Sequence, residues 1–374
     1  MRGVWIALFG LVLGVATIVS PVAGFSSAHG PELSGHALFT MTNSASGNQI
    51  MEFAQAPSGT LVWVANVSAG GTGTGISLAD SGSLTVTADH RWLLAVDAGS
   101  NQVSVFHIGR EGSVPSLRLT DVAPSGGATP VSVTTFGRLV YVLNVGNATL
   151  PGNIAGFYLT ASGQLNSIPG AVEPLSFSGA TGAAQISFNP SGTILVVTEK
   201  ATNLIDVFSL GRFGVAGPAV FEPSQGETPY GFAFAPDGAL IVSEAATGSL
   251  SSYQAGPYGQ WQVLSSAVPD FQTAPCWVAV GANGNVAYTT NAGSDSISSY
   301  AVAHSGVISL QSEVAATTDA APTDLAVSVN GQFLYVHDAG ALEIQGFAVS
   351  STGGLTWVST IGGLASGGEG LVAI

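Results

Sequence analysis

The sequence predicts an all-β fold, a single seven-bladed β-propeller, and three observations support this prediction. A strand-rich unit recurs along the chain, seven polar residues mark equivalent points of the units, and the two chain ends each resemble part of one further unit. Units of about 47 residues with about four short strands each are typical of propeller blades.

The repeated unit consists of strand, turn, strand, turn, strand. Its copies include "LTVTADHRWLLAVDAGSNQVSVF", "QISFNPSGTILVVTEKATNLIDVF" and "VAVGANGNVAYTTNAGSDSISSY". The strand segments are rich in Val, Ile, Leu, Phe and Tyr, and the turns hold pairs such as Asn-Gly, Asp-Gly and Ser-Gly. No convincing helical period appears after residue 24.

A polar residue ends the second predicted strand of every unit and serves as a ruler for the repeat. These ruler residues recur at similar intervals and are Asn43, Asp97, Asn144, Glu199, Glu244, Asn291 and Asp338. An aromatic residue follows each of them after nine to thirteen positions. The spacing therefore predicts seven blades of similar size.

The two ends of the chain are expected to share one blade. The C-terminal "GEGLVAI" resembles the first strand of a unit, whereas "HALFTMTN" at residues 36–43 resembles a second strand. Pairing the two closes the ring and removes the exposed edges that make open sheets aggregate. We assign the propeller to residues 35–374, with the glycine-rich stretch 70–82 as a long loop between two blades.

Residues 1–24 have the pattern of an export signal. Arg2 supplies a short basic region, residues 4–19 form an apolar run, and residues 22–24 form a small-residue cleavage site. An uncleaved anchor is the alternative, although this run is short for a membrane span. We expect a secreted or extracytoplasmic protein that begins with a short segment, residues 25–34, and has no membrane span in its mature form.

The composition argues against several classes of function. Seven Lys and Arg against 22 Asp and Glu give a net charge of −15, so no nucleic-acid partner is expected. Cys276 is the only cysteine and is expected to be a small buried residue. The chain has no G-x-S-x-G, H-E-x-x-H or C-x-x-C motif, so serine-elbow hydrolases, zinc proteases and thiol redox enzymes lack support.

The ruler residues are expected at one mouth of the central channel, because equivalent positions of radially arranged blades occupy equivalent places. Capping of tight turns explains the Asn and Asp members more simply than ligand binding does. Glu is poorly suited to capping, so Glu199 and Glu244 are the members that we favour for a ligand role. Further candidate binding residues at the mouth are Asn144, Asn291, Asp338 and His337.

Phrases such as "AVDAGSNQVSVF" and "AYTTNAGSDSISSY", and blade starts such as "TPYGFAFAPDG", carry a family resemblance. In them the chain resembles the lactonase-type seven-bladed propellers, which include propeller 6-phosphogluconolactonases and carboxymuconate-cyclizing enzymes, and also YVTN-repeat surface propellers. The resemblance implies a site at one mouth of the channel, where a His and an Arg at a blade start face a Glu at the end of the second strand. Glu199 in "VTEKATN" matches that glutamate and is the expected catalytic base.

Two positions depart from the family pattern. "TGAAQISF" places Gln185 where the family has His, and "TPYGF" places Tyr230 where the phosphogluconolactonases tend to have Arg. Because a phosphate group needs Arg or Lys partners, these departures argue against a phosphorylated lactone. Lys200, the only lysine of the chain, is the remaining candidate partner of an anionic group, and a solvated surface lysine is its alternative role.

Three functions remain open from the sequence. The first is a secreted hydrolase or cyclase for a small, oxygen-rich, non-phosphorylated lactone, with Glu199 as base and Gln185, Tyr230 and Lys200 as orienting groups. The second is a non-catalytic extracellular propeller that binds a ligand or a protein. The third and weakest is a redox propeller with a quinone cofactor. We expect a monomer that holds neither a metal ion nor a cofactor.

Overall fold

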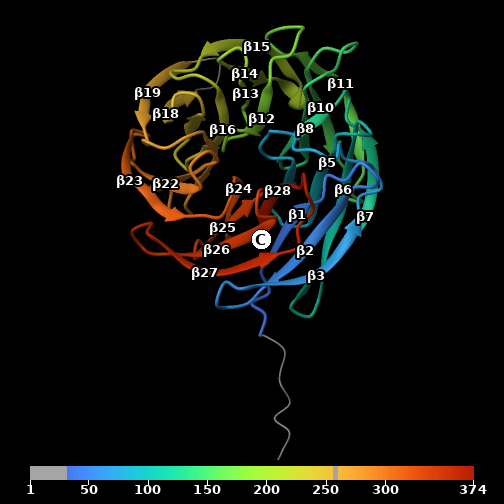
Figure 1. Cartoon of the computed structure of the whole chain (residues 1–374). Helices are drawn as coiled ribbons and strands as arrows, with labels where there is room; N and C mark the ends of the chain where they lie inside the picture. The colour runs from blue at the N-terminus through green and yellow to red at the C-terminus, as the bar shows by residue number, and fades with distance from the viewer. Residues whose placement is uncertain (1–31, 256–259) are drawn as a thin grey trace, which may run out of the picture. The chain divides into compact units, whose positions relative to one another are not determined.

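The prediction of a seven-bladed β-propeller is confirmed. The computed structural model describes residues 32–255 and 260–374. Within them, 28 strands form seven antiparallel sheets of four strands each. The sheets surround a central channel like the blades of a propeller (Figure 1). The seven innermost strands contact one another in a ring.

We number the blades 1 to 7 and give their strands from the channel outwards. Blade 1 consists of β28 (Glu369–Ala373), β1 (Ala37–Met41), β2 (Gln49–Gln55) and β3 (Leu61–Ser68). Blade 2 consists of β4 (Leu84–Val86), β5 (Trp92–Asp97), β6 (Gln102–Glu111) and β7 (Val114–Pro124). Blade 3 consists of β8 (Pro130–Phe136), β9 (Leu139–Asn144), β10 (Asn153–Leu159) and β11 (Leu165–Pro174).

The remaining four blades follow in chain order. Blade 4 consists of β12 (Ala183–Phe188), β13 (Ile194–Glu199), β14 (Leu204–Leu210) and β15 (Ala216–Pro223), with a 3-10 turn at Arg212–Gly214. Blade 5 consists of β16 (Pro229–Phe234), β17 (Ala239–Glu244), β18 (Ser249–Ala255) and β19 (Trp261–Pro269). Blade 6 consists of β20 (Pro275–Val280), β21 (Val286–Asn291), β22 (Ser296–Val302) and β23 (Ile308–Thr317). Blade 7 consists of β24 (Pro322–Val327), β25 (Phe333–Asp338), β26 (Glu343–Val349) and β27 (Leu355–Gly362).

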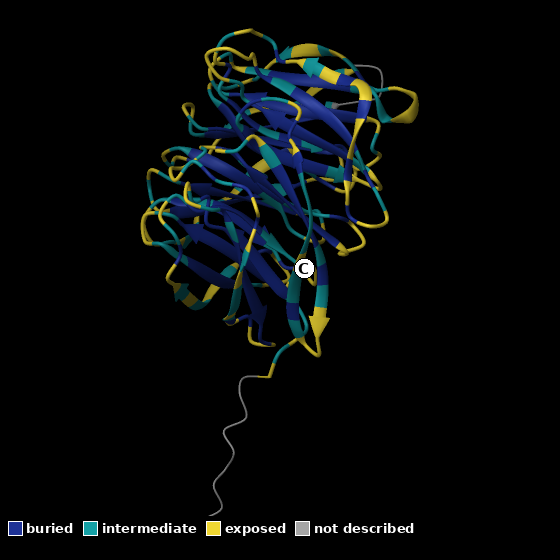
Figure 2. Cartoon of the chain, turned by 90° about the vertical axis from the view of Figure 1, so that its right-hand side faces the viewer, coloured by how far each residue is buried: buried dark blue, intermediate teal, exposed yellow. Residues whose placement is uncertain are grey.

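The second strand of a blade is buried on both faces, whereas the fourth strand borders solvent. All residues of β13, β17, β21 and β25 are buried, because the neighbouring blades cover both faces of the sheet. The outer strand β23 mixes half-buried and exposed residues. Figure 2 shows this gradient, with buried strands in the interior and exposed residues at the turns and outer strands.

Buried tyrosines connect successive blades by their hydroxyl groups. Tyr141, Tyr288 and Tyr335 occupy the same position of the second strand in blades 3, 6 and 7. Each hydroxyl donates a hydrogen bond of 2.6 to 2.8 Å to a glycine carbonyl in the outer turn of the next blade. A buried phenol needs such a partner, so these bonds satisfy the tyrosines and fix the spacing between blades.

The two ends of the chain share blade 1, as the sequence predicted. Strand β28 pairs antiparallel with β1, with Leu38 opposite Ala373 and Phe39 opposite Val372. The backbone bonds between Ala37 and Ile374 extend this pairing at the end of the sheet. The ring is therefore closed by hydrogen bonds between segments from opposite ends of the propeller sequence.

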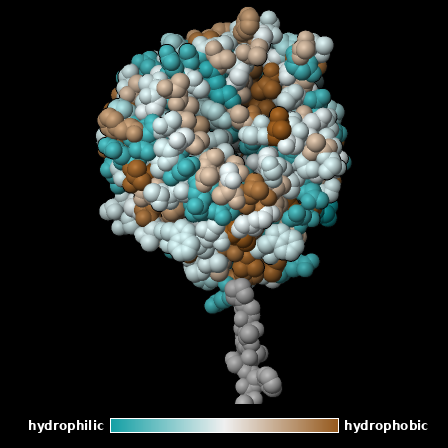
Figure 3. All heavy atoms as spheres, in the orientation of Figure 1, coloured by the Kyte–Doolittle hydropathy of each residue, from teal (hydrophilic) through white to brown (hydrophobic). Residues whose placement is uncertain are grey.

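The face seen in Figure 3 carries several small groups of hydrophobic residues among neutral and hydrophilic ones. This mixture agrees with a chain in which 46% of the residues are apolar and 8% charged. No helix among the described residues has the length and apolarity to cross a membrane. The expected export signal lies outside the described residues and stays a prediction.

Candidate functional site

The long loop 70–82, called the mouth loop below, lies across one end of the channel. This end, called the mouth, is where the innermost strands begin and the second strands end. The backbone N–H of Ser81 donates to the carbonyl of Ala184 in blade 4, at 2.9 Å. The N–H of Val133 in blade 3 donates to the carbonyl of Gly82, at 2.8 Å. The loop thus joins the edges of two innermost strands.

Side chains from the other side of the ring hold the same loop. The indole Nε1 of Trp277 in blade 6 donates to the carbonyl oxygen of Asp80, at 2.7 Å. The backbone N–H of Leu78 donates to Oε1 of Glu369 in blade 1, at 2.8 Å. Because partners from four blades bind it, the mouth loop forms the wall between the channel interior and this face of the propeller.

Three buried carboxyl groups and one lysine gather beneath and beside the mouth loop. Asp80 belongs to the loop, Asp324 to β24 and Glu369 to the start of β28, and they are 1%, 8% and 3% exposed. Lys200 follows β13 directly. We call these four residues the mouth cluster.

Burial and mutual repulsion set the protonation of the mouth cluster. Burial raises the pKa of Asp80 far above its usual value, and the negative charge of Glu369 adds to this rise. Burial likewise raises the pKa of Asp324. The pKa of Glu369 is raised by burial only to about 7, because hydrogen bonds from Ser77 and Leu78 and the charge of Lys200 oppose the rise. Near neutral pH, Glu369 is therefore the carboxyl group that exchanges a proton most readily.

The ammonium group of Lys200 is held at the mouth by two neighbours. Nζ lies 4.5 Å from the centre of the Tyr230 ring and donates a hydrogen bond to the carbonyl of Ala79. The Tyr230 ring in turn lies 5.0 Å from the Trp277 ring. Burial lowers the pKa of Lys200, and the charges of Asp80 and Glu369 partly offset this. The structure thus brings together two of the sequence-predicted residues, Lys200 and Tyr230.

Glu199 lies between blades rather than in the channel. It ends the second strand of blade 4, and the innermost strand of that blade separates it from the channel. It is fully buried, and its carboxylate accepts hydrogen bonds from Ser176 N at 3.0 Å, from Ser176 Oγ, and from Thr202 Oγ1 at 2.6 Å. Burial, and then the charge of Glu199, raise the pKa of the adjacent Asp206 to about 9. The catalytic role of Glu199 stays a prediction, and its surroundings are those of a residue that fixes an inter-blade loop.

Glu244 occupies the equivalent place in blade 5 and makes the same kind of contact. Its carboxylate accepts hydrogen bonds of 2.8 Å from Gly226 N and 2.9 Å from the hydroxyls of Ser224 and Ser249. A Cβ atom on Gly226 would lie 2.4 Å from Oε2 of Glu244, so only glycine lets the loop approach the carboxylate this closely. The two ruler glutamates therefore bind the loops that enter their blades.

The other ruler residues named as candidates are also fully buried between blades. Asn144 donates to Ser125 O and to Asn153 Oδ1, and Asn291 donates to the hydroxyls of Ser296 and Ser298. Binding roles for these residues stay predictions.

Asp338 and the two remaining candidates have different surroundings. The carboxylate oxygens of Asp338 have no hydrogen-bond partner among the described residues, and burial, followed by the charge of Asp319, raises its pKa to about 8. Burial lowers the pKa of His337 to about 4, so this buried imidazole is neutral. The side chain of Gln185 bonds both backbone groups of Phe232 and so bridges two innermost strands.

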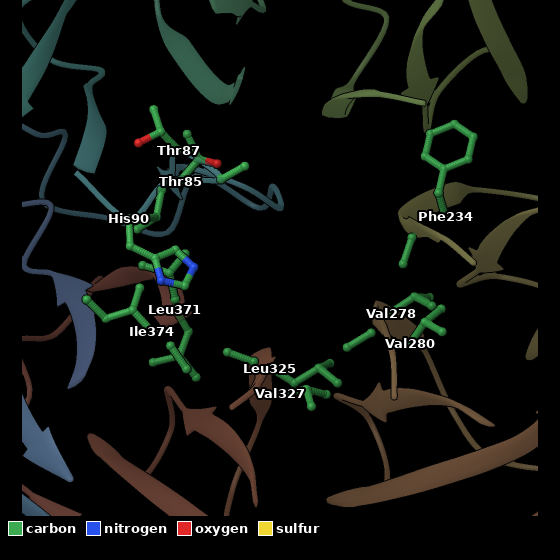
Figure 4. Close-up of a pocket in the computed structure, with 17 residues that line it drawn as sticks. Thr85, Thr87, His90, Phe234, Val278, Val280, Leu325, Val327, Leu371 and Ile374 are labelled. Atoms are coloured by element: carbon green, nitrogen blue, oxygen red, sulfur yellow. The ribbon is translucent and has the colours of Figure 1, made fainter. Parts of the chain in front are cut away.

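The opposite end of the channel is open and mainly apolar. A cavity of about 470 Å³ lies there, and Figure 4 shows Val278, Val280, Leu325 and Leu371 around it. His90 is its one ionisable side chain. Acid–base groups therefore gather at the mouth rather than at this end. Among the described residues, no group of three or more His, Cys, Asp or Glu is placed to hold a metal ion.

The sequence interpretation missed Asp80, Asp324, Glu369 and the contact made by Trp277. Two of them could have been found by aligning the blade starts, because Trp277 and Asp324 occupy the same position of "APCWV" and "APTDL". Glu369 is the first residue of the innermost strand of its blade. In four other blades the innermost strand begins with proline. Asp80 had no such signal, because its place depends on the path of the mouth loop.

A family model described as lactonase, 7-bladed beta-propeller, matches residues 81–258 and 249–363 of the chain. The chain belongs to this family. The lactonase-family assignment agrees with the blade count, the closure of the ring and the resemblance found in the repeats. No curated protein matches the chain significantly.

Solved structures of similar fold include several lactonase-type propellers. A putative 6-phosphogluconolactonase from Bacteroides uniformis is 20% identical, with 92% of this chain and 100% of that chain covered and a TM-score of 0.73. A second from Bacteroides fragilis is 18% identical, with 91% and 98% covered and a TM-score of 0.71. The periplasmic gluconolactonase PpgL of Pseudomonas aeruginosa is 17% identical, with 91% and 99% covered and a TM-score of 0.65. At these identities the likeness concerns the fold.

Proposed function

We propose that the protein is a secreted hydrolase that opens a small, non-phosphorylated lactone at the mouth of the channel, with Glu369 as the general base. The observation that carries this proposal is the placement of Glu369 in the buried mouth cluster, where burial raises its pKa to about 7 and the charge of Lys200 acts on it. A general base works best when its pKa lies near the working pH. Glu369 meets this condition more closely than Asp80 or Asp324, whose surroundings favour the protonated form.

The reaction follows from the chemistry of these two groups. The Glu369 carboxylate takes a proton from a water molecule as its oxygen attacks the carbonyl carbon of the lactone. Lys200 stabilises the negative charge that develops on the carbonyl oxygen. The ring C–O bond then breaks, the proton on Glu369 passes to the leaving alkoxide, and a hydroxy acid is released.

The mouth loop must move for substrate to reach Glu369. Glu369 is 3% exposed, and Leu78 of the loop donates a hydrogen bond to its carboxylate. Opening of an active-site loop on each turnover is common in enzymes that exclude water from the site. Because each of these bonds involves a charged group, and water competes for Leu78 and Ala79 when the loop opens, the net cost of breaking each bond is about 2 kcal/mol.

The distribution of basic residues favours a substrate without phosphate. Among the described Lys and Arg residues, only Lys200 lies at the mouth. Arg118 lies in the outer strand β7. The others lie in or beside turns at the opposite end, and they are Arg91, Arg110, Arg138 and Arg212. A phosphoryl group is usually held by several Arg or Lys side chains. A single lysine suits a carbonyl or a carboxylate better.

Secretion rests on the sequence pattern of residues 1–24, which has the basic, apolar and small-residue parts of an export signal. The periplasmic location named for the Pseudomonas aeruginosa propeller is compatible with export of this chain. The scarcity of thiols agrees with an oxidising compartment.

Hydrolysis of a lactone panel by the purified protein tests the proposal. The panel contains γ-butyrolactone, an alkyl lactone, gluconolactone and 6-phosphogluconolactone, and the rate is followed by acid release. Glu369→Gln should lower kcat by about 10²- to 10⁴-fold, the usual contribution of a positioned base. Glu199→Gln, which tests the base predicted from the sequence, should retain most of the activity.

The outcomes separate the two candidate bases and the binding alternative. A large loss in Glu199→Gln together with full activity of Glu369→Gln would contradict the assignment and support the sequence prediction. If the wild type hydrolyses none of the panel, the proposal fails, and a non-catalytic binding propeller becomes the better description.

A further inference from the structure

A second cavity lies beside the mouth cluster and is lined in part by the mouth loop. Its volume is about 520 Å³, which is within the usual range for small-molecule sites. Its walls are Leu78 of the mouth loop, the loop at residues 145–152 of blade 3, residues 178–183, and Lys200. Because Leu78 also bonds Glu369, this cavity and the proposed base are separated by a single stretch of backbone.

The walls of this cavity, called the lysine pocket below, are largely apolar. Leu78, Val145, Leu150 and Pro151 supply aliphatic surface, and most of the other lining residues are Gly or Ala. Leu150 is 52% exposed and lines the cavity. Exposed apolar side chains that gather around a cavity are typical of ligand sites.

An exposed aromatic residue, Phe177, lies next to the lysine pocket. Phe177 is 60% exposed and directly precedes the lining residues 178–183. A Cβ atom on Gly179 would lie 2.3 Å from the Phe177 ring, so the ring packs closely on the wall of the pocket. The apolar surface therefore continues from the pocket to its rim.

Few polar groups are available to a ligand in the lysine pocket. Of its fourteen lining residues, only Asn147, Ser178 and Lys200 have polar side chains. Oδ1 of Asn147 already accepts hydrogen bonds from Thr149 and Leu150 within its own turn. The ammonium of Lys200 has three donors, and one of them binds the carbonyl of Ala79. A sugar lactone with several hydroxyl groups would therefore find few side-chain partners in this pocket.

We propose that the lysine pocket binds an alkyl-substituted lactone and its hydroxy-acid product, with the alkyl chain against Leu78 and Leu150 and the carbonyl or carboxylate at Lys200. This inference rests on the proposed function and specifies its substrate class. One positive charge at the edge of an apolar cavity matches a ligand with one carbonyl or carboxylate group and an aliphatic chain. It differs from the oxygen-rich ligand that the sequence alone suggested.

The geometry also assigns a path to the proposed base. Lys200 lines the pocket and its ammonium donates to the carbonyl of Ala79, while the Glu369 carboxylate accepts from the N–H of the adjacent Leu78. A displacement of residues 78–79 joins the two spaces and brings the bound carbonyl to the base. The hydrogen bonds of Leu78 and Ala79 hold this part of the loop and thus control access.

Direct binding of straight-chain carboxylates tests the pocket independently of catalysis. The probes are butanoate, hexanoate and octanoate, with gluconate as the polyhydroxylated comparison, and affinities are measured by titration calorimetry on the full mature protein. Each added methylene should tighten binding about threefold to fivefold. Gluconate should bind more weakly than octanoate by at least tenfold.

Two pocket variants and two matched controls locate the binding. Lys200→Met and Leu150→Asn should each weaken octanoate binding about tenfold or more. Arg212→Met removes an exposed cation, and Val329→Asn an exposed aliphatic residue, from turns at the opposite end of the propeller. Both controls should leave octanoate binding unchanged.

The combined results distinguish this inference from the proposed function. Chain-length-dependent binding without hydrolysis of any lactone supports the pocket and overturns the proposed function. Hydrolysis of gluconolactone without any preference for alkyl lactones supports the proposed function and overturns the pocket assignment. Gluconate binding as tightly as octanoate, or octanoate binding that Leu150→Asn does not weaken, also overturns the pocket assignment.

Discussion

Replacing Glu369 by glutamine should make the protein more stable at neutral and alkaline pH. In the folded protein burial raises the pKa of Glu369 from 4.5 to about 7. The folded state therefore holds its proton more tightly than the unfolded state, so stability falls as pH rises from about 4.5 to about 7. Above pH 7 the ionised carboxylate costs the folded state up to about 3 kcal/mol, and glutamine removes this cost while its Oε1 still accepts the bond from Leu78.

The effect is measured as the difference in melting temperature between Glu369→Gln and wild type from pH 4 to pH 8. For a propeller of this size, about 3 kcal/mol corresponds to a rise of about 4 °C, from an unfolding entropy of about 2.1 cal/mol/K per residue. We expect no difference near pH 4, where both states are protonated, and the full difference near pH 8. The exposed Glu313 of β23 supplies the matched control, since Glu313→Gln makes the same chemical change at a site where nothing is buried.

A melting temperature that is lowered equally at pH 4 and pH 8 would refute the reasoning, because it would mean that the pKa of Glu369 is the same in the folded and the unfolded protein. Glu369 would then be a poor general base at neutral pH. The expected result, higher stability combined with lost activity, is the usual relation between an active-site carboxylate and stability.

Three further predictions concern the closure of the ring, the mouth loop and export. Deleting residues 369–374 removes β28 and exposes the edge of β1. Size-exclusion chromatography should then show aggregation, or thermal unfolding should show the loss of a cooperative transition. An unchanged melting temperature would contradict the shared blade. Trp277→Phe removes the donor to the Asp80 carbonyl, so amide hydrogen exchange of residues 76–80 should become about fivefold faster. This factor corresponds to the loss of one hydrogen bond of about 1 kcal/mol. An exchange rate equal to that of the wild type would show that this bond does not hold the loop. N-terminal sequencing of exported protein should find a start between residues 24 and 29, and an intact Met1 in a soluble cytoplasmic pool would contradict export.

Much of the fold could be predicted from the sequence because each blade repeats the same pattern of apolar strand segments and turn residues. Six ruler residues end second strands, as expected, and Asn43 lies just beyond the end of β1. The repeat showed where these residues lie along the strand but not which way their side chains face. In a blade, side chains stand perpendicular to the sheet, so Glu199 faces the loop of the preceding blade instead of the channel.

The mouth cluster could not be predicted in the same way because it has no repeat. Each blade start contributes a different residue to the mouth, such as Tyr230, Trp277 or Asp324, so comparison of the blades gives no consensus. Asp80 reaches the site only because its loop crosses the channel, and that path is set by partners such as Ala184 and Trp277 in distant blades.

The pairing of β28 with β1 has a consequence for how the protein acquires activity. Glu369 is the first residue of β28, so the proposed base lies on the strand whose pairing with β1 closes the ring. The strand that closes the ring therefore also carries the carboxylate of the proposed base. A chain whose ring has not yet closed therefore lacks the proposed base at the mouth, and the proposed hydrolysis is expected only of molecules that have finished folding.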